Sequence, residues 1–219
     1  SSEVFLQIIQ ELNNDKNVHG IMIQKPFPAN FAEDVVINSI NPDKDVDGFH
    51  PLNMGKLLLD KAGFIPSTAE AVLALLDFYD IETSGKKVTI LGRSNIVGKP
   101  LANLLLRKNK TGNATVTVCH SRSEDLKSIT TQADILIAAI GKAHFVKANM
   151  IKKGSILIDV GINQIQEPDA GLKYVGDIDF EDCLEKCSAI TPVPGGVGSV
   201  TTALLLNNVL KAFLKVKKL

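Results

Sequence analysis

The chain has 219 residues, 45% hydrophobic and 22% charged, a composition that excludes a disordered tail, a collagen-like repeat and a coiled-coil rod. Its 24 Lys and Arg residues balance 24 Asp and Glu residues, which argues against bulk nucleic-acid binding. Three irregularly spaced cysteines predict neither a disulfide framework nor a zinc site, and indicate reduced thiols in the cytoplasm or an organelle. No apolar run approaches the roughly 20 residues of a membrane span, so we expect no membrane segment.

The first 66 residues predict short helices around one strand. Apolar residues at helical spacing predict an amphipathic helix over 2–13, and another helix is expected over 34–40. Residues 18–23 predict a short buried strand, which the Pro26-Phe27-Pro28 segment ends. Residues 43–66 predict a loop rich in Asp and Gly, followed by a weak apolar stretch.

From residue 67 the sequence alternates between helical and strand-like segments. Ser67 and Glu70 fit a capping box for a helix that reaches about Tyr79, with Val72, Leu75, Leu76 and Tyr79 on one face. Short β-branched runs follow, separated by helical segments, which predicts βαβ units and a parallel sheet covered on both faces. These runs are 87–91, 114–119, 134–139 and 155–159.

The segment pattern predicts an α/β protein of two domains. We expect a first unit over residues 1–68, a Rossmann-like domain over 69–197, and a C-terminal helix over 198–219 that packs back on the first unit. The last segment is apolar nearly all round, which is typical of a buried helix. The sequence starts without Met and directly in a predicted helix, so the chain is expected to be a fragment or a processed product. The first unit is also short for an independent core.

The Gly92–Pro100 segment directly follows the first strand of the predicted sheet. This is the place of the phosphate-binding turn in a doubly wound fold, where amides at a helix N-terminus meet a pyrophosphate. The segment is not G-x-G-x-x-G, because Arg93 and Ser94 occupy the intervening positions. The alternative interpretation is an ordinary strand-to-helix turn.

The second strand runs into Cys119-His120-Ser121-Arg122-Ser123, with no carboxylate before Glu124. An NAD-binding domain places an acidic residue near this point, whereas a hydroxyl and a guanidinium suit the 2′-phosphate of NADP. Ser121 and Arg122 therefore predict NADP, with Arg122 as a solvated loop charge the alternative. His120 is expected to be structural rather than catalytic.

Two further segments carry unusual residues. The glycines of Pro192–Gly198 allow a close backbone approach to a ligand, although a rigid hinge between domains fits equally well. Asp45 and Asp47 alternate along a turn, but a calcium loop would need a longer ligand series, so no metal site is predicted. Gln24, at the end of a predicted strand, either points into a cleft or caps the strand.

Taken together, six segments resemble, in this order, the methylenetetrahydrofolate dehydrogenase/methenyltetrahydrofolate cyclohydrolase family over essentially the whole chain. They are Val18–Gln24, Lys44–Pro51, Gly92–Pro100, Thr115–Ser121, Ile158–Asn163 and Ile190–Gly198. The resemblance implies a Rossmann-like NADP domain, a catalytic domain for tetrahydrofolate derivatives with folate bound between the two, and a homodimer. It implies oxidation of 5,10-methylenetetrahydrofolate to the methenyl form, followed by hydrolysis to 10-formyltetrahydrofolate.

The resemblance also implies roles for individual residues. Gly92, Arg93 and Ser94 correspond to cofactor contacts, Ser121 and Arg122 lie near the ribose phosphate, and Ile162 corresponds to a backbone contact on the nicotinamide side. Gln24 resembles the catalytic glutamine, and Asp47 resembles the aspartate that accepts hydrogen bonds from the pterin ring. The loop that closes over the folate corresponds to Pro194, Gly195 and Gly196.

This sequence departs from the family pattern in one respect that concerns catalysis. The principal catalytic lysine of the family lies in a Tyr-x-x-x-Lys segment upstream of Gln24, and these 219 residues contain no such segment. Lys25 also stands where Leu usually follows the glutamine. The leading hypothesis is therefore an NADP-dependent folate enzyme without its N-terminal portion. The alternative is a non-catalytic nucleotide- or folate-binding module, if the 219 residues are the complete protein.

Overall fold

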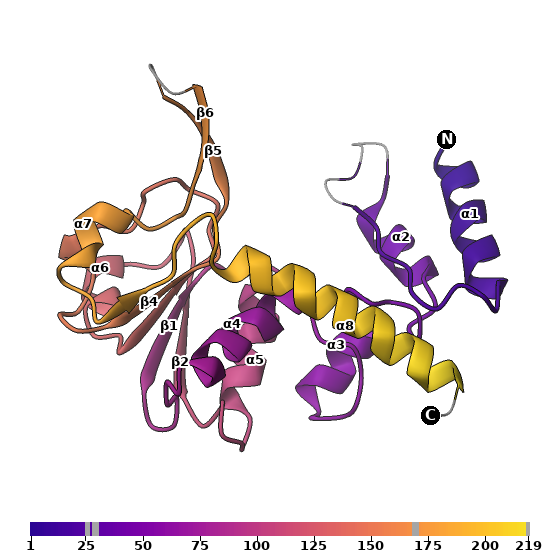
Figure 1. Cartoon of the computed structure of the whole chain (residues 1–219), viewed down its shortest axis with the longest axis horizontal. Helices are drawn as coiled ribbons and strands as arrows, with labels where there is room; N and C mark the ends of the chain where they lie inside the picture. The colour runs from indigo at the N-terminus through magenta and orange to yellow at the C-terminus, as the bar shows by residue number, and fades with distance from the viewer. Residues whose placement is uncertain (25–26, 28–30, 168–170, 218–219) are drawn as a thin grey trace. The chain divides into compact units, whose positions relative to one another are not determined.

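The structure is a computed structural model of the chain and describes residues 1–24, 27, 31–167 and 171–217 (Figure 1). Lys25 lies outside the described residues. The chain forms two compact units, one made of Ser1–Ser67 with Thr202–Leu219 and the other of Thr68–Thr201. Each unit is described by itself below, as unit 1 and unit 2.

Unit 1 contains the helices α1 (Ser2–Asn14), α2 (Glu33–Ser39) and α3 (Pro51–Leu58), and the greater part of α8 (Val197–Lys217). The predicted helices over 2–13 and 34–40 are confirmed as α1 and α2. Their inner faces share one apolar cluster, whose buried members are Ile9, Ile21, Val36 and Ile40.

The structure corrects two predictions in unit 1. The predicted strand over 18–23 is wrong, because Ile21 makes only an isolated parallel bridge to Asp45. Helix α3 was not predicted, yet its start carries clear signals: His50 accepts a hydrogen bond from the Leu52 amide at its Nδ1 atom (3.0 Å), and proline opens the first turn. The missed helix lies within residues 43–66, which were predicted as a loop rich in Asp and Gly followed by a weak apolar stretch.

Unit 2 is built on a parallel sheet in the order β2-β1-β3-β4-β7. The predicted strands are confirmed as β1 (Lys87–Leu91), β2 (Thr115–Cys119), β3 (Ile135–Ala138) and β4 (Ile156–Asp159), and β7 (Ala189–Ile190) was not predicted. Figure 1 shows α4 and α5 on one face of the sheet and α6 and α7 on the other. These helices span Ser67–Phe78, Gly98–Leu106, Leu126–Thr130 and Phe180–Leu184, and a 3₁₀ turn covers Ala148–Met150. All 4 residues of β3 are buried, as expected for a sheet covered on both faces.

The chain reverses its direction of progress across the sheet at β1, which pairs with β2 on one side and β3 on the other. A doubly wound sheet binds its ligand at such a switch point, beyond the carboxyl ends of the strands. An antiparallel hairpin of β5 (Asn163–Glu167) and β6 (Gly171–Val175) extends from unit 2 in Figure 1 and was not predicted. Tyr79, predicted to lie on the inner face of α4, is 67% exposed.

Helix α8 differs from its prediction as a helix buried nearly all round. Several of its large apolar side chains are exposed, namely Leu206, Val209, Leu210, Phe213, Leu214 and Val216. In the described part of the chain it alone is long and apolar enough to cross a membrane, by length and composition only, which differs from the sequence expectation. This is weak evidence, because a core helix of a folded protein passes the same test.

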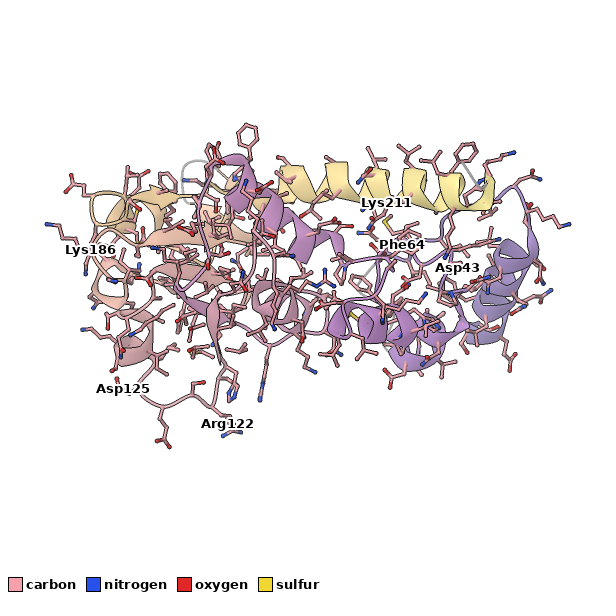
Figure 2. The ribbon with its side chains drawn as sticks, turned by 90° about the horizontal axis from the view of Figure 1, so that it is seen from below. Asp43, Phe64, Arg122, Asp125, Lys186 and Lys211 are labelled. Atoms are coloured by element: carbon pink, nitrogen blue, oxygen red, sulfur yellow. The ribbon has the colours of Figure 1, made fainter. Side chains whose placement is uncertain are left out.

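The other side of α8 packs within unit 1. Ala212 shares an apolar cluster with Val46 and Phe64, and Phe64 is labelled in Figure 2. The buried Asn208 side chain donates from Nδ2 to the carbonyl oxygens of Val46 (3.0 Å) and Ile65 (3.2 Å). These bonds tie α8 to two irregular segments of unit 1.

Replacing Asn208 is expected to destabilise the chain. Asn208→Ala leaves the Val46 and Ile65 carbonyls without this donor and opens a small cavity, so the free energy of unfolding should fall by about 1–3 kcal/mol. The exposed neighbour gives the control, and Asn207→Ala should change stability by less than about 0.5 kcal/mol. Urea unfolding of both variants measures the difference. Equal effects would contradict the assigned role of Asn208.

Candidate functional site

A pocket of about 300 Å³ lies at the carboxyl ends of β1, β2 and β3 in unit 2. The turn after β1, the loop after β2 and the loop after β3 supply most of its lining. Its lining residues are Leu91, Gly92, Arg93, Ser94, Cys119, His120, Ser121, Leu126, Ala139, Ile140, Lys142 and Phe145. The pocket therefore brings together four of the six predicted cofactor residues, Gly92, Arg93, Ser94 and Ser121, at the switch point of the sheet.

Glycine is required where the chain leaves β1. Gly92 has φ +119°, and a Cβ atom there would lie 2.2 Å from the carbonyl oxygen of Ala139 at the end of β3. A Cβ atom on Gly98, the first residue of α5, would lie 2.1 Å from the Gly92 carbonyl oxygen. The two glycines let the turn, the neighbouring strand and the helix approach one another closely, as in a nucleotide-binding turn.

Ser94 uses its polar atoms to organise the start of α5. Its Oγ accepts hydrogen bonds from the amides of Val97 (3.1 Å) and Gly98 (3.4 Å), and its carbonyl accepts one from Lys99 (3.0 Å). These amides are therefore paired within the protein, which differs from the expectation that they meet a phosphate. Arg93 and Lys142 add two cationic side chains to the lining of this pocket.

The loop after β2 carries Ser121 into the pocket, while Arg122 is exposed and is not among the lining residues. Figure 2 shows Arg122 and Asp125 on this loop, with Arg122 on its outer part. His120 shapes the loop: its Nδ1 accepts from the Arg122 amide (3.1 Å), and its own amide donates to Ser123 Oγ (3.0 Å). None of the described residues that line the pocket is an Asp or Glu.

Lys142 and Phe145 line the pocket and were missed in the sequence. The ammonium of Lys142 lies 5.7 Å from the centroid of the Phe145 ring. Their position after a strand adjacent to β1 was an available signal, since parallel strands direct their following loops to the same edge of a sheet. Lys142 adds a second cation to a pocket for which only arginines had been considered.

A buried carboxylate, Asp159, stands at the end of β4. It accepts hydrogen bonds from the amides of Gly161 (3.0 Å), Asp177 (2.9 Å) and Ile178 (2.7 Å). Burial raises the pKa of Asp159 to about 6, although the hydrogen bonds from these backbone amides act in the opposite direction. The carboxylate thus joins the segment after β4 to the segment after β6.

Ile162 does not line the pocket. It lies between β4 and β5 with 62% of its surface exposed, and its Cδ1 atom is 3.5 Å from where a Cβ on Gly198 would stand. The structure therefore places Ile162 beside the start of α8, whose first residues belong to unit 2.

The Pro192–Gly198 turn leads from β7 into α8. Pro194 is exposed, Gly195 has φ +103°, and a Cβ on Gly196 would lie 2.4 Å from the Pro192 carbonyl oxygen. Gly195 and Gly196 line a second, largely apolar groove of about 680 Å³, together with residues of α4, β4, α7 and β7. This groove is separate from the pocket that holds Gly92 and Ser121.

The predicted substrate residues Gln24 and Asp47 both lie in unit 1. They follow the Ile21–Asp45 bridge, and because this bridge is parallel both segments leave it in the same direction. Gln24 is exposed and Asp47 is half-buried.

The neighbouring carboxylate of Asp45 is a structural group of the turn. It is buried and accepts from the amides of Phe49 (3.2 Å) and His50 (2.8 Å) and from Asn53 Nδ2 (2.8 Å). Across the described residues, no group of three or more His, Cys, Asp and Glu side chains is placed to hold a metal ion.

Comparisons with known proteins agree with this arrangement. Residues 66–217 match the NAD(P)-binding domain, and residues 1–47 the catalytic domain, of the tetrahydrofolate dehydrogenase/cyclohydrolase family. The bifunctional protein FolD of Chlorobium phaeobacteroides is 53% identical over 222 residues, covering 99% of this chain and 75% of the relative.

Solved structures give the same result. The bifunctional enzyme FolD from Campylobacter jejuni is 46% identical, with a TM-score of 0.91, covering 100% of this chain and 74% of the other. The Trypanosoma brucei dehydrogenase-cyclohydrolase, solved with NADP cofactor and inhibitor, is 36% identical with a TM-score of 0.93, covering 100% and 74%. From its parallel sheet, its glycine turn and these matches, the chain belongs to the tetrahydrofolate dehydrogenase/cyclohydrolase family.

Proposed function

We propose that this chain serves one-carbon folate metabolism as an NADP-dependent methylenetetrahydrofolate dehydrogenase and methenyltetrahydrofolate cyclohydrolase. The first reaction oxidises 5,10-methylenetetrahydrofolate to the methenyl form, and the second hydrolyses that form to 10-formyltetrahydrofolate. The observation that carries the proposal is the pocket at the sheet's switch point, where Gly92, Arg93 and Ser121 meet in a chain of this family.

The residues present fit NADP. Gly92 has no side chain that would collide with the neighbouring strand in the turn. Arg93 and Lys142 supply positive charge, and Ser121 supplies a hydroxyl. A guanidinium can bind a 2′-phosphate in a bidentate manner, whereas a carboxylate in its place would favour a free 2′-hydroxyl. When bound, NADP supplies the oxidant of the dehydrogenase reaction.

The substrate side of the proposal depends on the family resemblance. Asp47 accepts hydrogen bonds from the amino-pyrimidinone edge of the pterin, and Gln24 lies beside the reacting one-carbon bridge. Gly195 and Gly196 allow the backbone of their turn to approach the folate closely. The contribution of these residues is to hold and orient the substrate, which can lower the barrier of a two-substrate reaction substantially.

The alternative function applies only if the 219 residues are the complete protein. The 219 residues contain no Tyr-x-x-x-Lys segment, and the amide of Gln24 does not titrate in the working range of an acid–base catalyst. A non-catalytic module that binds nucleotide and folate would need the cofactor pocket but no such lysine. The activity test at the end of this subsection separates the two candidates.

We also propose that the chain forms a homodimer in the cytoplasm. The hairpin of β5 and β6 carries exposed apolar side chains, with Leu172 64% and Tyr174 52% exposed. Exposed apolar groups on a projecting element favour association with another protein surface. Sedimentation equilibrium measures the oligomeric state directly.

Cofactor preference provides the first test. We expect NADP to bind at least about tenfold more tightly than NAD, because charge-assisted hydrogen bonds to the 2′-phosphate contribute about 1.5–3 kcal/mol. Arg93→Ala should remove most of this preference and Arg122→Ala less, since only Arg93 lines the pocket. Calorimetric titration with both cofactors measures each affinity.

The control for this experiment is Lys108→Ala, which removes an exposed cation that does not line the pocket. It should leave the ratio of the two affinities unchanged. Equal affinity of the unaltered chain for NADP and NAD would contradict the assignment of the 2′-phosphate site.

Asp47 provides a test of the substrate site. Asp47→Asn replaces an acceptor-only carboxylate by an amide that has one acceptor oxygen and competing donors, so folate affinity should fall about tenfold while NADP affinity changes little. Asp43→Asn is the control in the same unit, because Asp43 is exposed and pairs with Lys215. If folate and NADP affinities fall together in Asp47→Asn, Asp47 is a structural residue of its turn.

The missing Tyr-x-x-x-Lys segment predicts how a polypeptide of these 219 residues behaves. We expect it to bind NADP but to hydrolyse methenyltetrahydrofolate at a negligible rate, measured by the loss of substrate absorbance. A chimera that places before Ser1 the corresponding upstream segment of the Chlorobium relative should gain activity, and should lose it again when the lysine of that segment is replaced. Full turnover by the 219-residue chain would contradict this expectation and make Lys25→Met the next variant.

A further inference from the structure

The carboxylate of Asp177 is fully buried and receives four hydrogen bonds. Its Oδ2 atom accepts from the amides of Ile140 (2.6 Å) and Gly141 (3.0 Å), and its Oδ1 atom accepts from the Lys142 amide (2.7 Å). The fourth donor is the Nδ2 atom of Asn163 (2.9 Å). Three consecutive amides of the loop after β3 therefore converge on one carboxylate that comes from the segment after β6.

The position of Asp177 is itself fixed by its surroundings. Its amide donates to Asp159, and its carbonyl accepts from the Val146 amide (2.9 Å). Gly161 is also required beside it, because a Cβ atom there would lie 2.2 Å from Asp177 Cγ. A group held from several sides can define the position of a loop that is otherwise exposed.

The loop that Asp177 holds is part of the cofactor pocket. Ile140 and Lys142 line it, and the backbone at Lys142 determines from which point its exposed side chain reaches into the pocket. Asn163, the remaining donor, directly follows Ile162. One buried carboxylate thus links two segments that the proposed function places along the cofactor.

We propose that Asp177 is a positioning residue for NADP, which acts by fixing the Ile140–Lys142 loop so that the Lys142 ammonium contacts a phosphate of the cofactor. This inference rests on the proposed function, and its test separates the failure of one from the failure of the other. Asp177 itself touches neither cofactor nor substrate in this assignment. The Lys142 ammonium is the group that binds the cofactor phosphate in this assignment.

The charge and acceptor capacity of a carboxylate are both needed for this role. All four partners are donors, and an ionised carboxylate offers acceptor sites on both oxygens. In Asp177→Asn one oxygen becomes an amide nitrogen, which directs its own hydrogens at the Lys142 amide and Asn163 or at the Ile140 and Gly141 amides. At least one loop amide then loses its acceptor, and the loop is no longer held in this conformation.

The experiment measures NADP binding to the 219-residue chain by calorimetric titration and by the rise in melting temperature on adding NADP. We expect Asp177→Asn to raise the Kd for NADP about threefold to tenfold, which is no more than the effect of removing the Lys142 ammonium itself. Asp134→Asn is the matched control, because that carboxylate also accepts a backbone amide, from Lys87 (2.9 Å), and belongs to unit 2 but lines no part of the cofactor pocket. It should lower the melting temperature without changing the Kd by more than about twofold.

A double-mutant cycle distinguishes positioning from a merely structural effect. Lys142→Ala alone should raise the Kd for NADP about threefold to tenfold, and in the Asp177→Asn background it should raise it less than about twofold. Two effects that simply multiply would show that Asp177 does not act through Lys142 and would overturn the proposal. So would an unchanged Kd in either single variant.

Two further outcomes are decisive. If the unaltered chain does not bind NADP, both the proposed function and this inference are contradicted. If the unaltered chain and Asp177→Asn both bind NADP tightly, only this inference is contradicted. If Asp177→Asn does not fold, Gly141→Ala takes its place in the cycle, because φ at Gly141 is +65° and a Cβ atom there strains the loop that Asp177 holds without adding to the pocket lining. Independent effects of Gly141→Ala and Lys142→Ala would then overturn the proposal.

Discussion

Two buried carboxylates determine the carboxyl edge of the sheet in unit 2. Asp159 and Asp177 together accept hydrogen bonds from backbone amides that follow β3, β4 and β6. Burying an ionised group is costly unless hydrogen bonds replace its hydration, and backbone amides supply them here. The two carboxylates also constrain which residues can lie beside them. A Cβ atom at Gly161 would collide with Asp177, and one at Gly176 would collide with Asp159, so glycine is required at both positions.

The parts of the fold that could be predicted are those that carry their signal locally. The buried strands β1 and β3 are runs of β-branched and apolar residues, and α1 has apolar residues at helical spacing. The hairpin of β5 and β6 lacks such a signal because Asn163–Glu167 is mostly polar and projects from unit 2. Helix α3 was missed since Gly55 and its short length resemble a loop; Pro51 was a sequence signal for its start, whereas its capping by His50 becomes visible only in the structure.

The side chains that line the cofactor pocket could likewise be predicted only where their signal is local in the sequence. The residues after β1 and β2 were predicted because each directly follows a recognisable strand, and Ser121 does line the pocket with Arg93. Arg122, one residue further along, lies outside it because the hydrogen bond from its amide to His120 turns the loop. The link between Asp177 and the Ile140–Lys142 loop spans 35–37 residues and leaves no periodic pattern in the sequence.

Helix α8 shows why hydropathy alone did not predict how the last segment packs. An apolar helix has a strong reason to be buried, yet one face of α8 is exposed and the other carries a buried polar residue, Asn208. The carbonyls of Val46 and Ile65 belong to irregular backbone, where neither helix nor strand supplies a donor. A side-chain amide on a regular helix can supply it instead, since a buried carbonyl left unpaired costs free energy. The polar residue therefore specifies how α8 packs in unit 1, which the apolar residues around it do not.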